Sequence, residues 1–478
     1  MFFRQSASAG TAARSIWLSL FLVWSVHGLA AEFPGAAPGV SLLDNPLATA
    51  PNPAIQKVLK AIDAARIEAY DRKLVSFGTR HTLSDPDHPT RGVGAARAWI
   101  KAELERCNRD AGGRLEIAFD EFIQPPGPRV PAAAKLVNVV ATLPGSGAGA
   151  ARYFVISGHY DSMSKDVMKP EPDAPGANDD ASGTVAVMAS ACAMANMRPR
   201  ATIVFMAVVG EEQGLLGSTH WAELAKARGL DIAGMLTNDI VGGAKPVEGP
   251  GENTYVRVFA EGVPPAETLT REQRTLISTG GESDSGPRQL ARFVHDAGAR
   301  YVPDFPVRVM FRRDRYLRSG DHAPFLERGY AAVRLTEARE NFRHQHENVE
   351  VRDGIQYGDL PEYVDFGYVT QVAKLDAATL AALALAPAAP SKVELETFKL
   401  ENDTTLRWEP NREADIAGYR IVWRDTTAPF WQRAVYVGNV TRHTLAGVSH
   451  DDYLFGVQAI DQQGNASMTV YPVPVRTR

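Results

Sequence analysis

Five short stretches of this chain contain the histidines and carboxylates that could bind a metal. Three of them directly follow apolar runs that are typical of buried strands, at residues 153–157, 202–209 and 234–236. The side chains that could bind a metal are therefore expected at one edge of one sheet. The five stretches are Gly158–Ser162, Ala177–Gly183, Gly210–Gly214, Asn238–Asp239 and His344–His346.

The first stretch pairs a histidine with a carboxylate two residues later. Histidine nitrogen and carboxylate oxygen suit zinc, and a catalytic zinc keeps one position open for water. His159 and Asp161 project to the same side of an extended chain, so one could bind a metal while the other orients it. Taken alone, such a triplet is more often a surface or capping pair.

Two adjacent glutamates, Glu211 and Glu212, follow an otherwise apolar strand. Two negative charges at the mouth of a core cost free energy unless cations or hydrogen bonds compensate them. The pair could simply stand at a helix N-terminus, where the helix dipole stabilises carboxylates. Alternatively, one glutamate binds a metal and the other holds a proton near the metal-bound water.

The Asp179-Asp180 pair also has two interpretations. It could be an Asx-rich turn that caps the following helix. A carboxylate can also bridge two metals about 4 Å apart through its two oxygens, as a two-metal hydrolase requires. Each of the five stretches has an ordinary explanation by itself, but their occurrence together and in this order does not.

The ordered motifs resemble those of the co-catalytic di-zinc aminopeptidase family. They are Gly-His-x-Asp-Ser, Gly-Ala-Asn-Asp-Asp-Ala-Ser-Gly, Gly-Glu-Glu-x-Gly-Leu-Leu-Gly-Ser, the Asn238-Asp239 stretch and a late histidine. That family also contains secreted leucine aminopeptidases, glutamate carboxypeptidase and glutaminyl cyclases. The resemblance covers residues from roughly 50 to 380, and its first three motifs are long enough to be highly specific.

The resemblance implies two Zn²⁺ ions and five ligands. One zinc would be bound by His159 and Asp239 and the other by Glu212 and the late histidine. Asp179 would bridge the two ions, with a cis peptide bond to the next residue as a further expectation. The implied metal ligands are His159, Asp179, Glu212, Asp239 and His346.

The resemblance also implies two catalytic roles. Glu211 would be the general base that deprotonates the bridging water and passes the proton to the leaving amine, and Asp161 would orient His159. The activity implied is hydrolysis of N-terminal peptide bonds, with peptides that have a free N-terminus as substrates. The alternatives are a glutaminyl cyclase, a carboxypeptidase that uses the arginines of 312–318 as a carboxylate clamp, and a non-catalytic binding protein.

Two segments depart from the family pattern. The family's last ligand stands in a Tyr-His-Thr or similar triplet with an aspartate shortly after it. Here the alignment favours His346, with Glu350 near the position of that aspartate, and His344 is the alternative. Gly320-Asp321-His322 resembles the family's Ser-Asp-His-x-x-Phe segment, with Gly320 where serine is common. Asp321 and His322 either line the site or hold the sheet edge.

The elements around these motifs alternate in the manner of an α/β protein. A mixed, largely parallel central sheet flanked by helices is expected, followed by a small all-β sandwich. The less regular segment 242–318 should contain a strand at 255–259 and a helix at 287–297. The remaining helices are expected at 55–70, 92–107 and 184–194, with a further strand at 137–143.

The chain divides into five expected parts. Residues 1–31 have the charged, apolar and small-residue regions of a signal peptide, which predicts export to the periplasm or beyond the cell. A mature N-terminal segment (32–50), a di-zinc peptidase domain (51–383) and a linker (384–390) follow. Residues 391–478 resemble a fibronectin type III domain, with Tyr453 in the place of a tyrosine corner.

Composition limits the possible partners. A chain of 478 residues suggests two or three domains, and its net charge of −5 without a dense basic block predicts no nucleic-acid partner. No segment beyond the signal peptide is expected to form a stable membrane span, and nothing in the sequence defines an oligomeric state. Cys107 and Cys192 could pair if the protein is exported, but sequence does not show whether they come within bonding reach.

Overall fold

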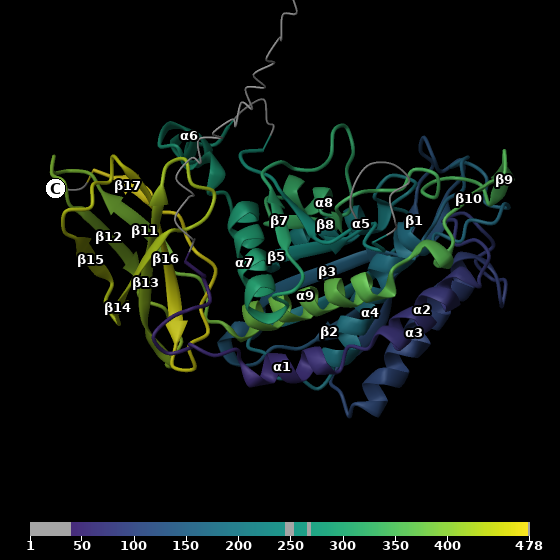
Figure 1. Cartoon of the computed structure of the whole chain (residues 1–478), viewed down its shortest axis with the longest axis horizontal. Coiled ribbons are helices and arrows are strands. Elements are labelled where there is room, and N and C mark those ends of the chain that lie inside the picture. The colour runs from purple at the N-terminus through teal and green to yellow at the C-terminus, as the bar shows by residue number, and fades with distance from the viewer. Residues whose placement is uncertain (1–39, 244–252, 265–268, 477–478) are drawn as a thin grey trace, which may run out of the picture. The chain divides into compact units, whose positions relative to one another are not determined.

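Eight strands form one mixed sheet at the centre of the computed structural model (Figure 1), which describes residues 40–243, 253–264 and 269–476. The strand order is β1-β2-β4-β3-β5-β8-β6-β7, and the four central strands β4, β3, β5 and β8 are parallel. This confirms the predicted mixed, largely parallel sheet. The strands are β1 (Glu116–Gln124), β2 (Ala134–Leu143), β3 (Arg152–His159), β4 (Thr202–Val208), β5 (Asp231–Asn238), β6 (Val256–Ala260), β7 (Val307–Met310) and β8 (Ala332–Glu337).

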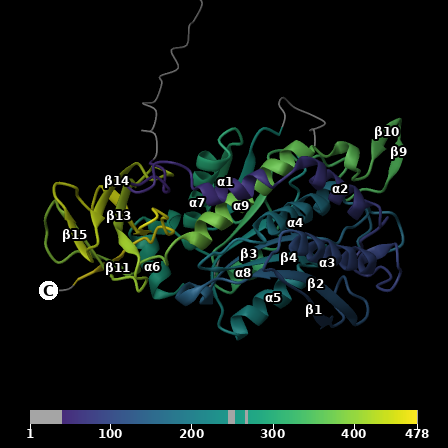
Figure 2. The same cartoon turned by 90° about the horizontal axis from the view of Figure 1, so that it is seen from below.

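Helices cover both faces of this sheet, and α5 lies on the opposite face from α4 and α9 (Figure 2). Alternate residues of β3 point to different cores: Ile156 packs with the α4 and α9 face, and Val155 packs with the α5 face. Burial on both faces explains why these strands are apolar throughout. One face has α1 (Pro53–Lys60), α2 (Ala64–Val75), α3 (Gly92–Asp110), α4 (Ser182–Met194), α7 (Gly286–Tyr301) and α9 (Phe366–Leu385), and the other has α5 (Leu216–Ala227) and α8 (Ala323–Glu327).

The sequence prediction of one helix over 55–70 is wrong, because α1 ends at Lys60 and α2 begins at Ala64. The side chain of Asp63 accepts hydrogen bonds from the amides of Ala65 and Arg66, so it caps a new helix where the apolar spacing alone continues. Strand β1 was not predicted. It lies at the sheet edge with several exposed residues, so it lacks the continuous apolar signal of the central strands.

A disulfide joins Cys107 on α3 to Cys192 on α4, with their Cα atoms 5.6 Å apart. The structure therefore settles the pairing that the sequence left open. The bond connects two helices on the same face of the sheet, across 85 residues of sequence.

The C-terminal strands form two sheets that share one apolar core. Their orders are β15-β12-β11-β17 and β14-β13-β16. In a tyrosine corner, the tyrosine hydroxyl bonds to the backbone a few residues upstream, and Tyr453 was expected to make this bond. Tyr419 makes a bond of this kind instead: its hydroxyl accepts from the Asn411 amide at 2.8 Å. The strands are β11 (Ser391–Glu396), β12 (Thr404–Glu409), β13 (Ile416–Asp425), β14 (Arg433–Gly438), β15 (Arg442–Leu445), β16 (Tyr453–Asp461) and β17 (Val473–Val475). The likeness to a fibronectin type III domain stays a prediction.

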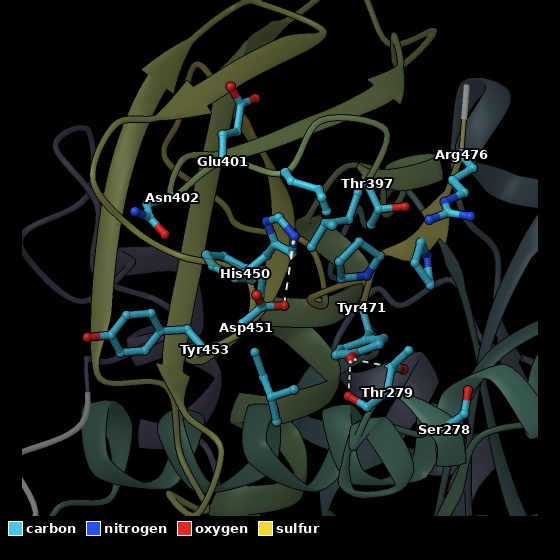
Figure 3. A pocket seen from close by; sticks show the side chains of 16 residues that line it. Ser278, Thr279, Thr397, Glu401, Asn402, His450, Asp451, Tyr453, Tyr471 and Arg476 are labelled. Atoms are coloured by element: carbon cyan, nitrogen blue, oxygen red, sulfur yellow. Dashed lines mark hydrogen bonds and ion pairs between the residues drawn. The ribbon is translucent and has the colours of Figure 1, made fainter. Parts of the chain in front are cut away.

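Buried ion pairs connect the C-terminal strands to the rest of the chain. Arg424 on β13 donates to Asp284 at 2.5 Å, and Arg292 on α7 donates to the same carboxylate at 3.1 Å. A cavity of about 780 Å³ lies between these strands and the end of α6 (Arg271–Ser278), where the Tyr471 hydroxyl contacts Thr279 (Figure 3). None of the predicted metal ligands lines this cavity, so it is separate from the candidate site.

The predicted signal peptide, residues 1–31, lies outside the described residues. Within the described ranges, no helix has both the length and the apolar character that crossing a membrane requires.

Candidate metal centre

The predicted ligands meet at the carboxyl edge of the parallel strands. His159 is the last residue of β3, Asp239 directly follows the last residue of β5, and Glu212 stands in the loop after β4. Asp179 lies in the turn that leads into α4, and His346 lies in the loop after β8. Loops at this edge of an open α/β sheet commonly build binding sites, because the strands end at the same level there.

These residues form two groups that share Asp179. His159 Nε2 lies 3.2 Å from Asp179 Oδ1 and 3.9 Å from Asp239 Oδ1. His346 Nε2 lies 2.9 Å from Asp179 Oδ2 and 3.3 Å from Glu212 Oε2. The two oxygens of Asp179 therefore face different groups. We call His159, Asp179 and Asp239 the inner group and Asp179, Glu212 and His346 the outer group.

Unsatisfied polar atoms in these groups fit a bound cation. Among the described residues, His159 Nε2 and Glu212 Oε1 are buried and make no hydrogen bond. A buried polar atom without a partner is costly, and a metal ion would satisfy both atoms. The donor set of imidazole nitrogens and carboxylate oxygens is one that zinc accepts. The residues present therefore fit zinc.

Electrostatics also favours a positive charge here. Burial raises the pKa of Glu212, and the nearby His346 offsets this increase only in part. Burial would lower the pKa of His346, but Glu212 and Asp179 reverse this effect and raise that pKa to about 11. The surrounding carboxylates therefore favour a positive charge at this position, which is the charge that a bound cation would supply.

Asp161 lies behind His159 and is fixed from several sides. Its carboxylate accepts from the Thr82 hydroxyl at 3.0 Å and from the amides of Glu211 and Glu212, each at 3.3 Å. His159 Nδ1 lies 3.2 Å from the Asp161 carbonyl oxygen and 3.5 Å from its Oδ1. Asp161 therefore links the β3 end to the glutamate loop and fixes the imidazole ring of His159.

The peptide bond between Asp179 and Asp180 is cis. The Asp180 carboxylate accepts from the amides of His159 at 3.0 Å, Gly183 at 2.9 Å and Ile240 at 3.3 Å. It therefore joins the ends of β3 and β5 to the start of α4 and is not a member of either group.

Glu211 directly precedes Glu212 of the outer group in the sequence and is partly exposed. Burial of its carboxylate, with further repulsion from Asp239 and Glu212, raises its pKa well above the ordinary range, although His159 acts in the opposite direction. A carboxylate with a raised pKa is a stronger base, which suits it to take and return a proton.

His346, and not His344, reaches the cluster. His344 Nδ1 lies 3.0 Å from the Gly358 carbonyl oxygen, and its ring stacks on Tyr363 at 3.7 Å between centroids. Glu350, expected near the position of the family aspartate, is exposed and pairs with Arg352 at 2.9 Å.

The other residues that the sequence singled out have partners within the chain. Asp321 accepts from the Ser218 hydroxyl at 2.5 Å, and His322 Nε2 lies 2.9 Å from the Arg313 carbonyl oxygen. The arginines of 312–318 are largely paired within the chain: Arg315 and Arg318 donate to the same carboxylate of Glu340 at 2.8 Å and 2.5 Å.

Sequence reasoning missed three residues that contact the ligands. Asp359 accepts from the Asp179 amide, Gln345 donates to Asp179 Oδ2 at 3.0 Å, and Arg334 lies 2.9 Å from Asp239 Oδ2. Arg334 could have been found, because a lone charge inside the apolar run 332–335 demands a buried partner. Asp359 stands outside every recognised motif.

Comparisons with known proteins identify the family of this chain. The sequence pattern of the family described as peptidase family M28 matches residues 138–362. A probable zinc metalloprotease from Leptosphaeria maculans is 45% identical over 425 residues, which cover 89% of this chain and 98% of that protein. A probable zinc metalloprotease from Pyricularia oryzae is 44% identical, with 89% and 85% covered. The crystal structure of LapB from Legionella pneumophila is similar in fold, with a TM-score of 0.50 at 17% identity, covering 73% of this chain and 79% of that one. The sequence similarity shows that this chain belongs to peptidase family M28.

Proposed function

We propose that this chain is an exported, zinc-dependent aminopeptidase that hydrolyses N-terminal peptide bonds with Glu211 as the general base. The observation on which this rests is the pair of ligand groups that share Asp179, with Glu211 beside them. The relatives named as probable zinc metalloproteases support zinc as the metal. The two-zinc count is part of the proposal.

Each residue of the site has a separate role in this proposal. His159 and Asp239 would hold one zinc, Glu212 and His346 the other, and Asp179 would contact both. Two zinc ions in these groups would supply a Lewis acid for the substrate carbonyl and lower the pKa of a bound water. The Glu211 carboxylate takes a proton from the attacking water and delivers it to the nitrogen of the leaving amine.

Burial supports cleavage at a chain end. All three residues of the inner group are buried, whereas the His346 side chain of the outer group is 39% exposed. A peptide that enters past His346 would meet a closed end at the inner group. The site would therefore accept a terminus and reject the middle of a chain.

Charge supports the amino end over the carboxyl end. Burial raises the pKa values of Glu211 and Asp321, and the nearby charge of Asp239 raises both further. These three carboxyl groups therefore lie close together, where they could bind the ammonium group of a substrate. A carboxypeptidase would need a cation for the substrate's carboxylate, but Arg315 and Arg318 are already paired with Glu340. This distribution disfavours the carboxypeptidase alternative.

The test uses the purified chain from residue 32 with matched peptides. One set has a free N-terminus, a second is N-acetylated, and a third is amidated at the C-terminus. We expect release of the N-terminal residue from the first and third sets and none from the second, with two zinc ions per active chain by elemental analysis. Cleavage that requires a free carboxyl terminus would favour a carboxypeptidase. Cyclisation of N-terminal glutamine without hydrolysis would favour a glutaminyl cyclase.

A further inference from the structure

The cavity of about 780 Å³ beside α6 has no part in the proposed peptidase chemistry (Figure 3). It is bordered by the loop after β11, the loop before β16, the end of α6 and the segment that contains β17. Its volume is within the range of about 300–1,000 Å³ that is common for small-molecule sites. The cavity is therefore large enough to hold a ligand of its own.

Polar side chains reach this cavity from three segments of the chain. In the view of Figure 3 they surround a central imidazole, and they belong to Glu401, Asn402, His450, Asp451 and Arg476. His450 Nδ1 is buried and, among the described residues, makes no hydrogen bond. A buried polar atom without a partner is costly, so a ligand that bonds this nitrogen would remove that cost.

The charges in this cavity favour a neutral ligand. Glu401 and Asp451 carry carboxylates, and Arg476 carries a guanidinium group. Groups of both signs in one cavity do not concentrate ligands of either charge. Each of them still offers hydrogen bonds, because carboxylates accept and a guanidinium group donates. Hydroxyl groups both donate and accept, so a neutral ligand with several hydroxyls matches this lining.

Tyr471 adds an apolar wall to the cavity. A Cβ atom at Gly281 would lie 2.8 Å from Cε1 and Cζ of Tyr471, so the lack of a side chain there lets the ring pack against the backbone. The Tyr471 hydroxyl contacts the Thr279 carbonyl oxygen at 3.4 Å. A ring fixed in this way presents apolar surface at low cost in conformational entropy. An aromatic ring beside hydrogen-bonding groups matches the C–H face and the hydroxyls of a sugar ring.

A peptide matches this cavity less well. Strand β17 is the edge strand of its four-stranded sheet, and it borders the cavity. A peptide that extended this sheet would need backbone hydrogen bonds from the edge. Pro472 and Pro474 line the cavity and have no N–H group to donate. This edge is therefore poorly suited to the addition of a strand.

We propose that the cavity binds a neutral saccharide, with the Tyr471 ring against the sugar face and with Asp451 and His450 hydrogen-bonded to its hydroxyls. The C-terminal strands would then hold the protein on a carbohydrate, separately from the metal centre. This site is independent of the proposed peptidase activity, because none of the candidate metal ligands contributes to it.

The test measures the binding of cellotetraose, maltotetraose and tetra-N-acetylchitotetraose to the mature protein by calorimetry. We expect at least one of them to bind at one site per chain. Asp451→Ala should weaken that binding at least about tenfold, the scale of a lost hydrogen bond to a charged group. Tyr471→Ala should also weaken it, whereas Tyr471→Phe keeps the ring and should bind as the unchanged protein does. Asp110→Ala, an exposed change on α3, should not alter the binding.

The Asp451 side chain is 88% exposed, so its replacement should not disturb the fold, which thermal unfolding checks for every variant. Failure of all three oligosaccharides to bind the unchanged protein would overturn the inference. Equal binding by Asp451→Ala, Tyr471→Ala and the unchanged protein would overturn it as well. Binding of an N-acetylated peptide that Asp451→Ala abolishes, without binding of any saccharide, would identify a peptide site instead.

Discussion

The carboxylate of Asp359 accepts a hydrogen bond from the backbone amide of Asp179 at 2.7 Å. It also accepts from the Asn178 amide at 2.9 Å. These bonds fix the backbone at the residue whose two oxygens face the two ligand groups. Asp359 therefore holds the proposed bridging ligand in place without touching a metal.

Replacing Asp359 by asparagine should weaken zinc binding, because an amide NH₂ group would face a backbone N–H donor. Loss of such an indirect support typically costs about 10–100-fold in metal affinity or activity. We expect the fall in kcat to exceed any change in KM, with zinc affinity measured by competition with a chelator. Asp365→Asn is the control, since Asp365 caps α9 by accepting from the Tyr368 amide. Unchanged zinc affinity in Asp359→Asn would exclude this role.

Glu211→Gln should retain zinc and lose at least about two orders of magnitude in kcat, the scale of general-base loss. Glutamine has the same shape but cannot accept the proton. Elemental analysis and steady-state kinetics measure the two effects separately. Glu223→Gln, on the surface of α5, should leave both unchanged. Full activity in Glu211→Gln would remove that residue from its role.

The two late histidines should behave differently. His346→Gln should lower zinc affinity, because its Nε2 is an atom of the outer group. His344→Gln should retain zinc, since that ring bonds the Gly358 carbonyl oxygen and stacks on Tyr363. The His344→Gln variant should instead unfold at a lower temperature than the unchanged protein. The reverse result would make His344 the ligand.

The disulfide should contribute to stability and not to chemistry. In the chain-entropy account, a bond that closes 85 residues stabilises by about 4–5 kcal/mol. A Cys107→Ser, Cys192→Ser double variant should therefore unfold at lower urea concentration, with kcat unchanged at a temperature where it stays folded. A large fall in kcat under those conditions would connect α3 and α4 to the site.

The central fold and the meeting of the candidate ligands at one edge of the sheet were predictable from sequence, because their signals are local. Continuous apolar strands require a doubly covered sheet, and charges placed directly after such strands must lie at its edge. The ligands His159 and Asp239 are examples, since each stands within one residue of a strand end.

The contacts that support the ligands were not predictable in the same way. Asp359 and Asp179 are 180 residues apart, and only the return of the chain after β8 brings them together. Arg334 departs from the apolar pattern of its strand, but only the folded chain shows that its partner is Asp239. The break after Lys60 depends on the side-chain cap by Asp63, which competes with apolar spacing.

The pair of Asp376 and Asn238 should make stability fall as pH rises. Asp376 is fully buried on α9, and its Oδ2 accepts from Asn238 Nδ2 at 2.7 Å. Burial raises the pKa of Asp376 to about 7, although the Asn238 hydrogen bond lowers it. The folded protein therefore keeps a proton that the unfolded chain releases above pH of about 4. The contribution of Asp376 to the free energy of unfolding therefore falls between pH of about 4 and 7 and stays constant at higher pH.

Asp376→Asn removes this proton and should be more stable than the unchanged protein by a few kcal/mol at pH 8, by the linkage between pKa and folding. The difference should shrink as the pH falls and disappear near pH 4, where Asp376 is protonated in both states. Urea unfolding at a series of pH values measures this, with Asp173→Asn, an exposed partner of Arg91, as the control. A difference that stays constant with pH would mean that Asp376 is ionised in the folded protein, despite its burial beside a single donor.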